Sequence, residues 1–202
     1  MTSPSRLTDR KRDAIIQAAI AEFRANGFEA TSVDKVAARA EVSKRTLYNH
    51  FASKDELFAA ILDILWESSA SEPRRAYEPR RPVREQLIEL LQSKLAMLAD
   101  DNFLALARVA IAAALHSPER AREMVDRIGQ KDNAMLDWIR AAQKHGALKA
   151  GDAAQAYKQL ECLVKGVAFW PQLAMGQPRL TPAAQKKLAA ASADLFLSHY
   201  GV

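Results

Sequence analysis

The sequence predicts an all-α fold of about nine helices, and three observations lead to that class. Apolar residues recur at spacings of three and four along almost the whole chain, as the buried face of a helix requires. No segment shows the alternation of apolar and polar residues that marks a half-buried strand. Helix start and stop signals recur, with Ser117-Pro118 and Thr181-Pro182 at predicted starts and Gly27 and Gly201 at predicted ends.

Composition and charge narrow the kind of protein. The chain has 202 residues, its 49% apolar content is enough for a packed core, and its single cysteine excludes an intrachain disulfide. The formal charge is +5, and residues 1–54 hold ten Lys or Arg against six Asp or Glu. The basic excess therefore gathers near the N-terminus, as expected for a segment that contacts nucleic acid. Because we find no targeting segment and no apolar run long enough to cross a bilayer, we expect a cytoplasmic protein.

The first predicted helix begins near Leu7 and ends near Ala25. Its apolar residues follow helical spacing, at Ile15, Ile16, Ala19, Ile20 and Phe23. Asn26-Gly27 is expected to end the helix, because Gly27 tolerates backbone angles that a side chain would resist, and Phe28 then packs back onto it. Basic residues at the front of this helix either contact phosphates or form a solvated end: Arg6, Arg10, Lys11 and Arg12.

Residues 31–54 contain two short helices separated by a tight turn, which is the pattern of a helix-turn-helix motif. Thr31 or Ser32 is suited to cap the first of them. The second has only Leu47 and Phe51, spaced i and i+4, as clear apolar anchors. A helix so short and polar cannot hold a core by itself, so its outward face must contact another molecule.

The polar face of the second short helix is suited to duplex DNA. Long cationic and amide side chains near its N-terminus can reach phosphates and base edges in the major groove. These positions are Lys44, Arg45, Thr46 and Asn49. Tyr48 adds a ring for a sugar or a thymine methyl group, and Lys54 lies where Ser53 and Glu56 form the capping box of the next helix, a place suited to phosphate. We therefore predict DNA binding; a solvated polar helix is the alternative.

Several motifs occur together in this part of the chain. They are the run NGF, the spacing T(S)V..VA..A.VS..TLY.HF.SK..L and the apolar helix that follows. On these motifs, residues 12–62 resemble the DNA-binding domain of TetR-type transcriptional regulators. The resemblance implies that a set of residues lies at the DNA surface: Thr31, Lys44, Arg45, Thr46, Tyr48, His50 and Lys54. Ser32 and Asn49 complete the predicted DNA-binding set. Many members carry glycine where this chain has Glu41, so Glu41 must accept the backbone angles of the turn without the freedom of glycine.

The rest of the chain shows only helical patterns. Residues 54–68 form a helix with an apolar stripe long enough to link two domains, and residues 69–82, with three prolines and four arginines, read as a mobile loop. The remaining predicted helices cover residues 83–98, 101–115, 117–145, 152–171 and 181–201, with Pro171 expected to kink or end the fourth. We therefore predict a helix-turn-helix domain over residues 1–54 and a larger helical domain over residues 69–202.

Helix-turn-helix proteins of this kind bind palindromic DNA as dimers, so a second surface must pair two chains. In TetR-type regulators the last two helices of each subunit form a four-helix bundle with those of the partner. The apolar or small residues that qualify here are Leu160, Val164, Val167, Ala168, Leu188, Ala191, Ser192 and Leu195. Part of this set is expected to complete the core of the subunit instead.

The resemblance also implies a ligand cavity among the middle helices, coupled to the DNA-binding domain through residues 54–68. Aromatic and sulfur-containing residues suit a small apolar effector, although the same residues can form ordinary core: Trp66, Met97, Phe103, Met124, Met135, Trp138, Phe169 and Trp170. The segment from Phe169 to Gly201 is similar to the C-terminal part of the AefR-like subgroup. We therefore predict a homodimeric regulator, a repressor that binds a palindromic operator and is released by a small apolar effector.

Other chemistry is not evident in the sequence. The four histidines are scattered without the spacing of metal ligands, and no nucleophile elbow or glycine-rich phosphate loop is present. We predict no catalytic residue, no metal site and no cofactor. Cys162 lies in an apolar helix and is expected to be buried. A regulator that senses oxidants through Cys162 is one alternative function, and an enzyme is another.

Overall fold

The computed structural model describes residues 4–70, 75–130 and 134–202, and within them it contains eleven helices and no β-strand. The predicted all-α class is confirmed. The helices are α1 (Pro4–Ala30), α2 (Val33–Arg39), α3 (Lys44–His50), α4 (Lys54–Ala70), α5 (Val83–Leu98), α6 (Asp101–Leu115), α7 (Pro118–Gln130), α8 (Ala134–Lys144), α9 (Ala153–Ala168), α10 (Trp170–Ala174) and α11 (Pro182–Tyr200). Side chains of residues 4–7, 66, 68–70 and 125–130 lie outside the described part. No described helix is both long and apolar enough to span a bilayer.

Two predicted helices are divided. The one expected over residues 117–145 is present as α7 and α8, on either side of residues 131–133, which lie outside the description. The one expected over residues 152–171 is present as α9, which ends at Ala168, and α10, which begins at Trp170 with Pro171 in its first turn; Phe169 (φ −132°, ψ −63°) lies between them. Proline lacks the N–H that would continue the first helix, so this break follows the prediction.

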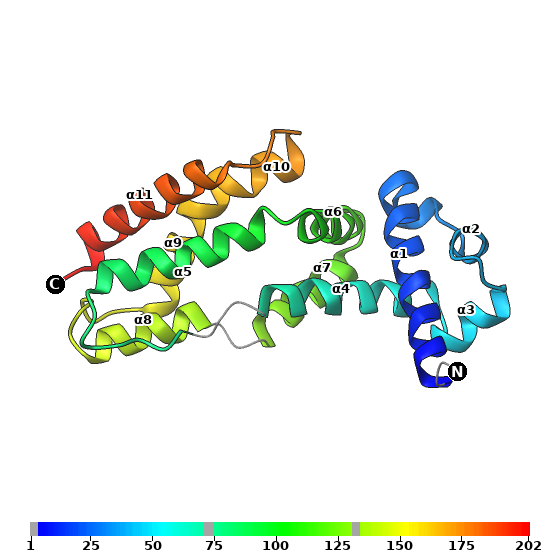
Figure 1. Ribbon diagram of the computed structural model, residues 1–202, viewed down its shortest axis with the longest axis horizontal. Coiled ribbons are helices and arrows are strands. Elements are labelled where there is room, and N and C mark those ends of the chain that lie inside the picture. Colours follow the sequence, from blue (N-terminus) through cyan, green and yellow to red (C-terminus); the bar gives the residue numbers. More distant parts are fainter. Residues whose placement is uncertain (1–3, 71–74, 131–133) are drawn as a thin grey trace. The chain divides into compact units, whose positions relative to one another are not determined.

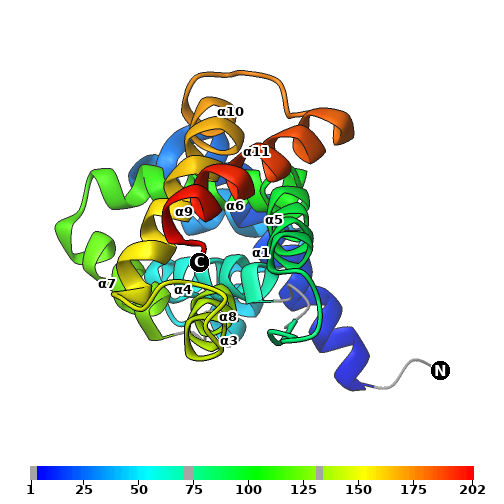
Figure 2. The same cartoon turned by 90° about the vertical axis from the view of Figure 1, so that its left-hand side faces the viewer.

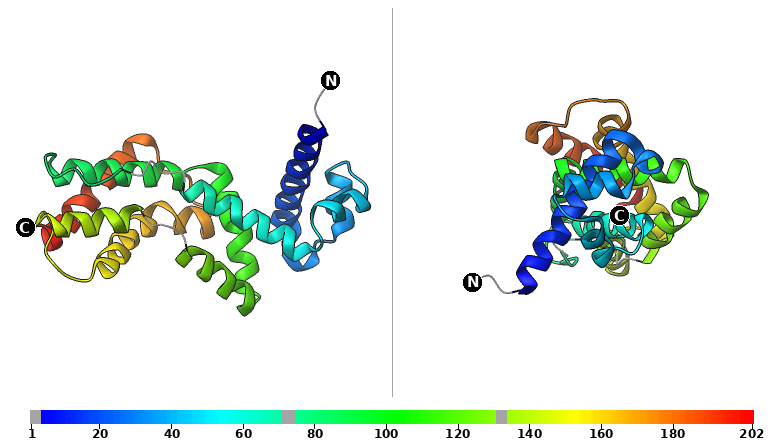
Figure 3. Two further views of the ribbon diagram at one scale, coloured as in Figure 1. Left: turned by 90° about the horizontal axis from the view of Figure 1, so that it is seen from below. Right: turned by 90° about the vertical axis from the view of Figure 1, so that its right-hand side faces the viewer.

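The chain forms two compact units, one of residues 1–67 with 105–130 and one of residues 68–104 with 131–202. In the first unit, α2 and α3 pack against α1, as Figure 1 and Figure 3 show. α7 belongs to the first unit, with the N-terminal helices. The functional division into residues 1–54 and 69–202 therefore differs from the structural one and stays a prediction.

The N-terminal helices share an aromatic core. Phe28 lies beyond Gly27, whose backbone (φ 78°, ψ 164°) interrupts the helical part of α1 as predicted. The Phe28 ring lies 5.1 Å from the rings of both Phe23 and Phe58, measured between ring centroids. Other buried apolar residues of these helices are Ile16, Ala19, Ile20, Val36, Leu47 and Phe51, whereas Val33 is only half-buried.

In the second unit, α11 lies along α5 and α9, and α8 packs on α9 (Figure 2). Leucines at helical spacing form the buried face of α5: Leu87, Leu91, Leu95 and Leu98. Leu148 and Gly201 form an isolated antiparallel bridge, and the Lys149 N–H donates to the Tyr200 carbonyl at 2.8 Å. The C-terminal end of α11 is thereby tied to the segment that follows α8.

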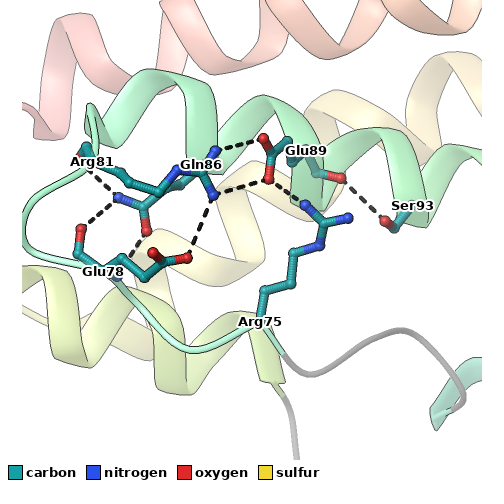
Figure 4. A network of polar contacts seen from close by, with 6 residues as sticks. All are labelled: Arg75, Glu78, Arg81, Gln86, Glu89 and Ser93. Carbon is teal, nitrogen blue, oxygen red and sulfur yellow. Dashed lines mark hydrogen bonds and ion pairs between the residues drawn. The ribbon is translucent and has the colours of Figure 1, made fainter.

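The segment before α5 is held by a buried glutamine (Figure 4). Gln86 is 4% exposed; its Oε1 accepts from the Glu78 N–H, and its Nε2 donates to the carbonyls of Glu78 and Arg81, all at 2.9 Å. Arg81 also pairs with Glu89 at 2.6 Å, and Arg75 pairs with the same carboxylate. Residues 75–82 therefore form a loop, as predicted, that these contacts hold in place, whereas residues 69 and 70 belong to α4 and residues 71–74 lie outside the description.

Candidate nucleic-acid interface

The third helix is short, and a few residues set its start and its packing. Ser43 Oγ accepts a hydrogen bond from the Thr46 N–H at 3.0 Å, so Ser43 is the N-cap. Leu47 is fully buried, and Phe51, which follows the helix, is 2% exposed. These two anchors hold α3 against α1 and leave the rest of its surface outside the core.

The turn between α2 and α3 contains a residue in left-handed backbone angles. Ser32 caps the N-terminus of α2, and its Oγ accepts from the Lys35 N–H at 3.3 Å. After the C-terminus of α2, the Val42 N–H donates to the Ala37 carbonyl at 3.0 Å. Glu41, one residue earlier, has φ 54°, a value that favours glycine. The sequence-based prediction that Glu41 must accept such angles is confirmed.

The outward face of α3 carries the predicted polar side chains. Lys44, Arg45, Tyr48 and Asn49 are exposed, and Thr46 and His50 are half-buried. Lys44 Nζ lies 2.9 Å from Asp34 Oδ1 of α2, and this hydrogen bond and the carboxylate charge raise the pKa of Lys44. The helix-turn-helix motif thus presents cationic, amide and phenol groups on one side of a short helix, a set suited to base edges and phosphates in a major groove.

Thr31 is placed differently from the prediction. Its side chain is 2% exposed, and its hydroxyl donates to the Gly27 carbonyl at 2.8 Å and the Glu22 carbonyl at 3.2 Å. The hydroxyl therefore satisfies carbonyls at the interrupted end of α1. This side chain does not reach the DNA-facing surface, and the cap of α2 is its neighbour Ser32.

Lys54 is also turned inward. Its Nζ donates to three backbone carbonyls, those of Phe28 at 2.9 Å, Glu29 at 3.2 Å and Thr31 at 3.3 Å. The same ammonium group lies 4.4 Å from the centroid of the Phe28 ring. An ammonium group has three N–H donors, so these carbonyls use all of them. Lys54 thus ties the start of α4 to the end of α1, and the predicted phosphate contact does not fit this conformation.

The predicted capping box of α4 is present, with one difference. Ser53 Oγ accepts from the Glu56 N–H at 3.0 Å, and the Glu56 carboxylate accepts from the Ala52 N–H at 2.6 Å. The carboxylate thus reaches back one residue before the cap. An acidic group therefore occupies the N-terminal end of this helix.

One functional candidate, Arg120 of α7, has no signal in the sequence. Its guanidinium pairs with Glu29 at 2.6 Å and with Asp55 at 3.2 Å, and it lies 3.9 Å from the centroid of the Phe28 ring. The Arg120 side chain is 17% exposed. Because Glu29 precedes Arg120 by 91 residues, no local pattern predicts the pair.

Two sequence families match the chain. The profile described as "Bacterial regulatory proteins, tetR family" matches residues 15–61, and "AefR-like transcriptional repressor, C-terminal domain" matches residues 85–202. The second match alone spans more than half of the chain. The chain belongs to the TetR family. It is therefore a transcriptional regulator with a DNA-binding helix-turn-helix, and because members of this family are not enzymes, the enzyme alternative is excluded.

Individual relatives agree with this assignment. A TetR family transcriptional regulator from Pseudomonas syringae pv. tomato str. DC3000 is 46% identical, with a TM-score of 0.85 over 100% of this chain and 99% of that one. The flavonoid-responsive regulator FrrA is 26% identical, with a TM-score of 0.72 over 96% and 98%. Bacillus subtilis YhgD is 38% identical over 39% of this chain, and Mycolicibacterium smegmatis FasR, an activator, is 32% identical over 46%. The chain spans 41% and 43% of the length of these two curated relatives.

The residues predicted to line the effector pocket of this TetR-family chain are dispersed. Met124 belongs to the first unit, whereas Met97, Phe103, Met135, Trp138, Phe169 and Trp170 belong to the second. Phe169 lies 6.1 Å from Phe103 and 5.0 Å from Trp170 between ring centroids, but Trp138 stacks edge-on with Tyr77 at 5.6 Å. The side chain of Trp66 lies outside the described part.

A small recess lies among α5, α8 and α9. Its lining surface is apolar and comes from Leu91, Met135, Leu160 and Val164 and from apolar atoms of Lys94, Glu161 and Lys165. Its cavity volume is about 10 Å³, far below the range of about 300–1,000 Å³ for typical ligand pockets. Met135 is thus the one predicted pocket residue that lines this recess.

The residues predicted for the dimer interface divide into two groups. Leu160, Val164, Ala168 and Ser192 are at most 6% exposed within the isolated subunit, so they are the part of the set that completes its core. Val167 is 48% exposed and Leu195 is 60% exposed. Ala191 is also exposed and Leu188 is half-buried, so these four residues remain candidates.

Cys162 lies on the exposed side of α9, contrary to the expectation of a buried thiol. The helix buries Leu160 and Val164, which are two residues before and after it, and this places Cys162 on the opposite face. The prediction is wrong because it is based on the apolar residues of the helix, and these describe only its buried face.

Proposed function

We propose that this regulator is a homodimeric repressor that binds a palindromic operator through α3 and is released by a small apolar effector. The observation that carries the proposal is α3 itself, a capped helix anchored by Leu47 and the following Phe51, whose other side chains are polar and mostly exposed. In this proposal residues 1–54 are the DNA-binding domain and residues 69–202 bind the effector and the partner chain. Its place of action is the cytoplasm, where bacterial DNA lies.

The proposed DNA contacts come from two helices of the motif. Arg45 and Asn49 are suited to base edges, because guanidinium and amide groups pair with guanine and adenine. Lys44 and Tyr48 are suited to phosphates and sugars, and the remaining proposed contacts are Ser32, Thr46 and His50. The side chains of Thr31 and Lys54 are left out because both are engaged with backbone carbonyls.

The proposed dimer surface is the outer face of α9 and α11. Exposed apolar residues on both helices support it: Val167 on α9 and Leu195 on α11, with the small Ala191 one turn before Leu195. α9 and α11 pack against each other, so these residues share one part of the subunit. Two recognition helices in a symmetric dimer can read half-sites about one helical turn apart, roughly 34–36 Å.

Two comparisons support repression and an apolar effector. The C-terminal profile is named for a transcriptional repressor, and FrrA is described as flavonoid-responsive. A panel of flavonoids and of aliphatic compounds of similar size tests the effector. Release of bound duplex by an apolar compound supports the proposal, and retention of the duplex by the whole panel at millimolar concentration counts against it.

Selection from random duplex DNA tests the DNA-binding part. We expect enrichment of a two-fold symmetric site with half-sites one helical turn apart. A recovered site without symmetry contradicts the dimeric mode, and a failure to enrich any sequence contradicts specific binding. Transcription from a promoter that carries the recovered site then separates repression from activation, the role printed for FasR.

The exposure of Cys162 favours one second candidate, a regulator that responds to oxidants. The test compares the parent with Cys162→Ser after treatment with hydrogen peroxide. If the thiol is a sensor, only the parent loses affinity for its selected duplex. An equal response of the two proteins eliminates this candidate.

A further inference from the structure

We propose that Arg120 of α7 is a positioning residue for DNA binding, through which α7 sets the geometry of the helix-turn-helix motif. The proposal rests on the function proposed above. Among the described residues, the partners of Arg120 are Glu29, Asp55 and the ring of Phe28, none of which lies on α3. It acts through these residues, and its effect on DNA is indirect.

The partners of Arg120 stand at both ends of the helix-turn-helix motif. Glu29 lies three residues before the cap Ser32, where the chain enters the motif. Asp55 lies in the first turn of α4, where the chain leaves it. A single guanidinium therefore holds the entry and the exit together, with N···O distances of 2.6 Å and 3.2 Å. The bidentate shape of the guanidinium makes this possible; a lysine would place one point charge between two carboxylates.

The Phe28 ring makes this attachment firmer. Arg120 lies 3.9 Å from its centroid and Lys54 4.4 Å, so two cations contact one ring. Phe28 in turn packs on Phe23 and Phe58 of the aromatic core. Lys54 donates to three carbonyls of the same corner. The corner between α1 and α2 is thus fixed to α4 and α7 by a cluster of charge-assisted hydrogen bonds over a buried ring.

The position of Arg120 is set by the first turn of α7. Ser117 Oγ accepts from the Arg120 N–H at 3.3 Å and donates to the Glu119 carboxylate at 3.0 Å. Arg120 is only 17% exposed, whereas Glu29 and Asp55 are 67% and 71% exposed. The arginine is therefore the inner, constrained member of the cluster. A displacement or fraying of the start of α7 must pull on both ends of the motif or break the cluster.

α7 is followed in the chain by residues 134–202, to which we assign the effector and the partner chain. α7 is therefore a second route between the two functions, in addition to the continuous helix α4. Coupling between two sites is reciprocal, so DNA bound at α3 must also stabilise the start of α7. That reciprocity gives a test that needs no effector.

The experiment compares the full-length parent with Arg120→Ala, Arg120→Lys and the control Arg84→Ala. Arg84 makes a bidentate pair with Asp194 in the other unit, so its loss removes an arginine pair of the same kind without touching the helix-turn-helix motif. Affinity is measured for the duplex recovered by selection, over a range of salt concentrations and at a temperature where each variant is folded by circular dichroism. Hydrogen exchange of residues 120–124 is measured with and without that duplex.

We expect Arg120→Ala to lower the affinity about tenfold, within the usual range of coupling between sites, with an unchanged salt slope. Arg120→Lys retains part of the affinity, and Arg84→Ala retains all of it. In the parent, the duplex slows exchange at residues 120–124; in Arg120→Ala this effect is lost. A simple loss of stability would raise exchange with and without DNA alike.

Several outcomes overturn the inference. Parent-like affinity in Arg120→Ala shows that the cluster does not position the motif. A salt slope flatter by about one shows instead that Arg120 neutralises a phosphate directly. If the duplex still slows hydrogen exchange at residues 120–124 in Arg120→Ala, coupling through Arg120 and α7 is contradicted. If the parent itself binds no selected duplex, the proposed function fails first, which is a distinct result.

Discussion

At the scale of single residues, we expect sequence recognition to depend most on the side chain of Arg45. It is exposed near the N-terminal end of α3, and a guanidinium pairs bidentately with the two acceptor atoms of guanine. We expect Arg45→Ala to cost about 1–3 kcal/mol of binding free energy on the selected duplex and to relax specificity at one base pair per half-site. Arg24→Ala, which removes an exposed arginine of α1, is the control. Equal affinity and equal specificity of the two variants would remove Arg45 from the interface.

Lys54 carries the same charge as Arg45 but is expected to stabilise the fold and not to contact DNA. Its ammonium group satisfies three carbonyls where α1 ends, so its loss leaves those carbonyls to water or to no partner. We expect Lys54→Ala to lower the free energy of unfolding by about 1–2 kcal/mol and to leave the salt slope of DNA binding unchanged. Urea unfolding and binding across salt concentrations measure the two quantities. An unchanged stability with a slope flatter by about one would return Lys54 to the phosphate contacts.

At the scale of elements, the turn between α2 and α3 carries local strain. Glu41 has φ 54°, and a side chain in left-handed angles costs about 1–2 kcal/mol relative to ordinary helical ones. Glycine removes that cost but is more flexible in the unfolded chain, so we expect Glu41→Gly to raise the free energy of unfolding by about 0.5–1 kcal/mol. Glu41→Ala, which removes the carboxylate and keeps the Cβ, is the matched control. A gain in alanine equal to that in glycine would assign the effect to charge and not to backbone strain.

The elements also show which features are readable from sequence. Ser32, Ser43 and the Ser53–Glu56 pair cap their helices as predicted, because a cap depends on residues within one turn. The predictions that the side chains of Thr31 and Lys54 contact DNA do not fit the structure, for a different reason. Each side chain has a polar group that can bind phosphate. In the structure that group donates instead to backbone carbonyls at the interrupted end of α1, which the sequence pattern does not reveal.

Contacts between segments far apart in the sequence cannot be predicted from local spacing. Arg120 meets Glu29 across 91 residues of chain, and no spacing rule relates them. The same limit applies to the faces of α9 and α11. Helical spacing identifies Leu160 and Leu195 equally as apolar, and only the packing of the subunit buries the first and exposes the second.

At the scale of the whole molecule, the proposed function depends on two copies of the chain. One α3, with two buried anchors and a few exposed contacts, offers little surface to DNA, and a palindrome rewards two such helices held at a fixed spacing. Joining two half-site interactions in one particle raises the affinity well above that of either half. The exposed apolar residues of α9 and α11 are the means proposed for this joining.

Leu195→Asp tests that proposal, because a carboxylate on an apolar face must be desolvated when two subunits meet. Leu195 is 60% exposed, so the substitution should leave the folded subunit intact while the dimer dissociates. The matched control is Leu115→Asp, since Leu115 is 78% exposed at the end of α6 and belongs to the other unit. We expect sedimentation to show a dimer for the parent and for Leu115→Asp and a monomer for Leu195→Asp at the same micromolar concentration.

DNA binding then separates pairing from recognition. The Leu195→Asp monomer should bind the full palindrome as weakly as a single half-site, because its α3 is untouched and only the joining of two half-sites is lost. The parent should bind the palindrome far more tightly than the half-site. If Leu195→Asp remains a dimer with full affinity, the pairing surface lies elsewhere on the chain. If instead it loses half-site binding too, the substitution has disturbed the fold, and a melting curve below that of Leu115→Asp would show it.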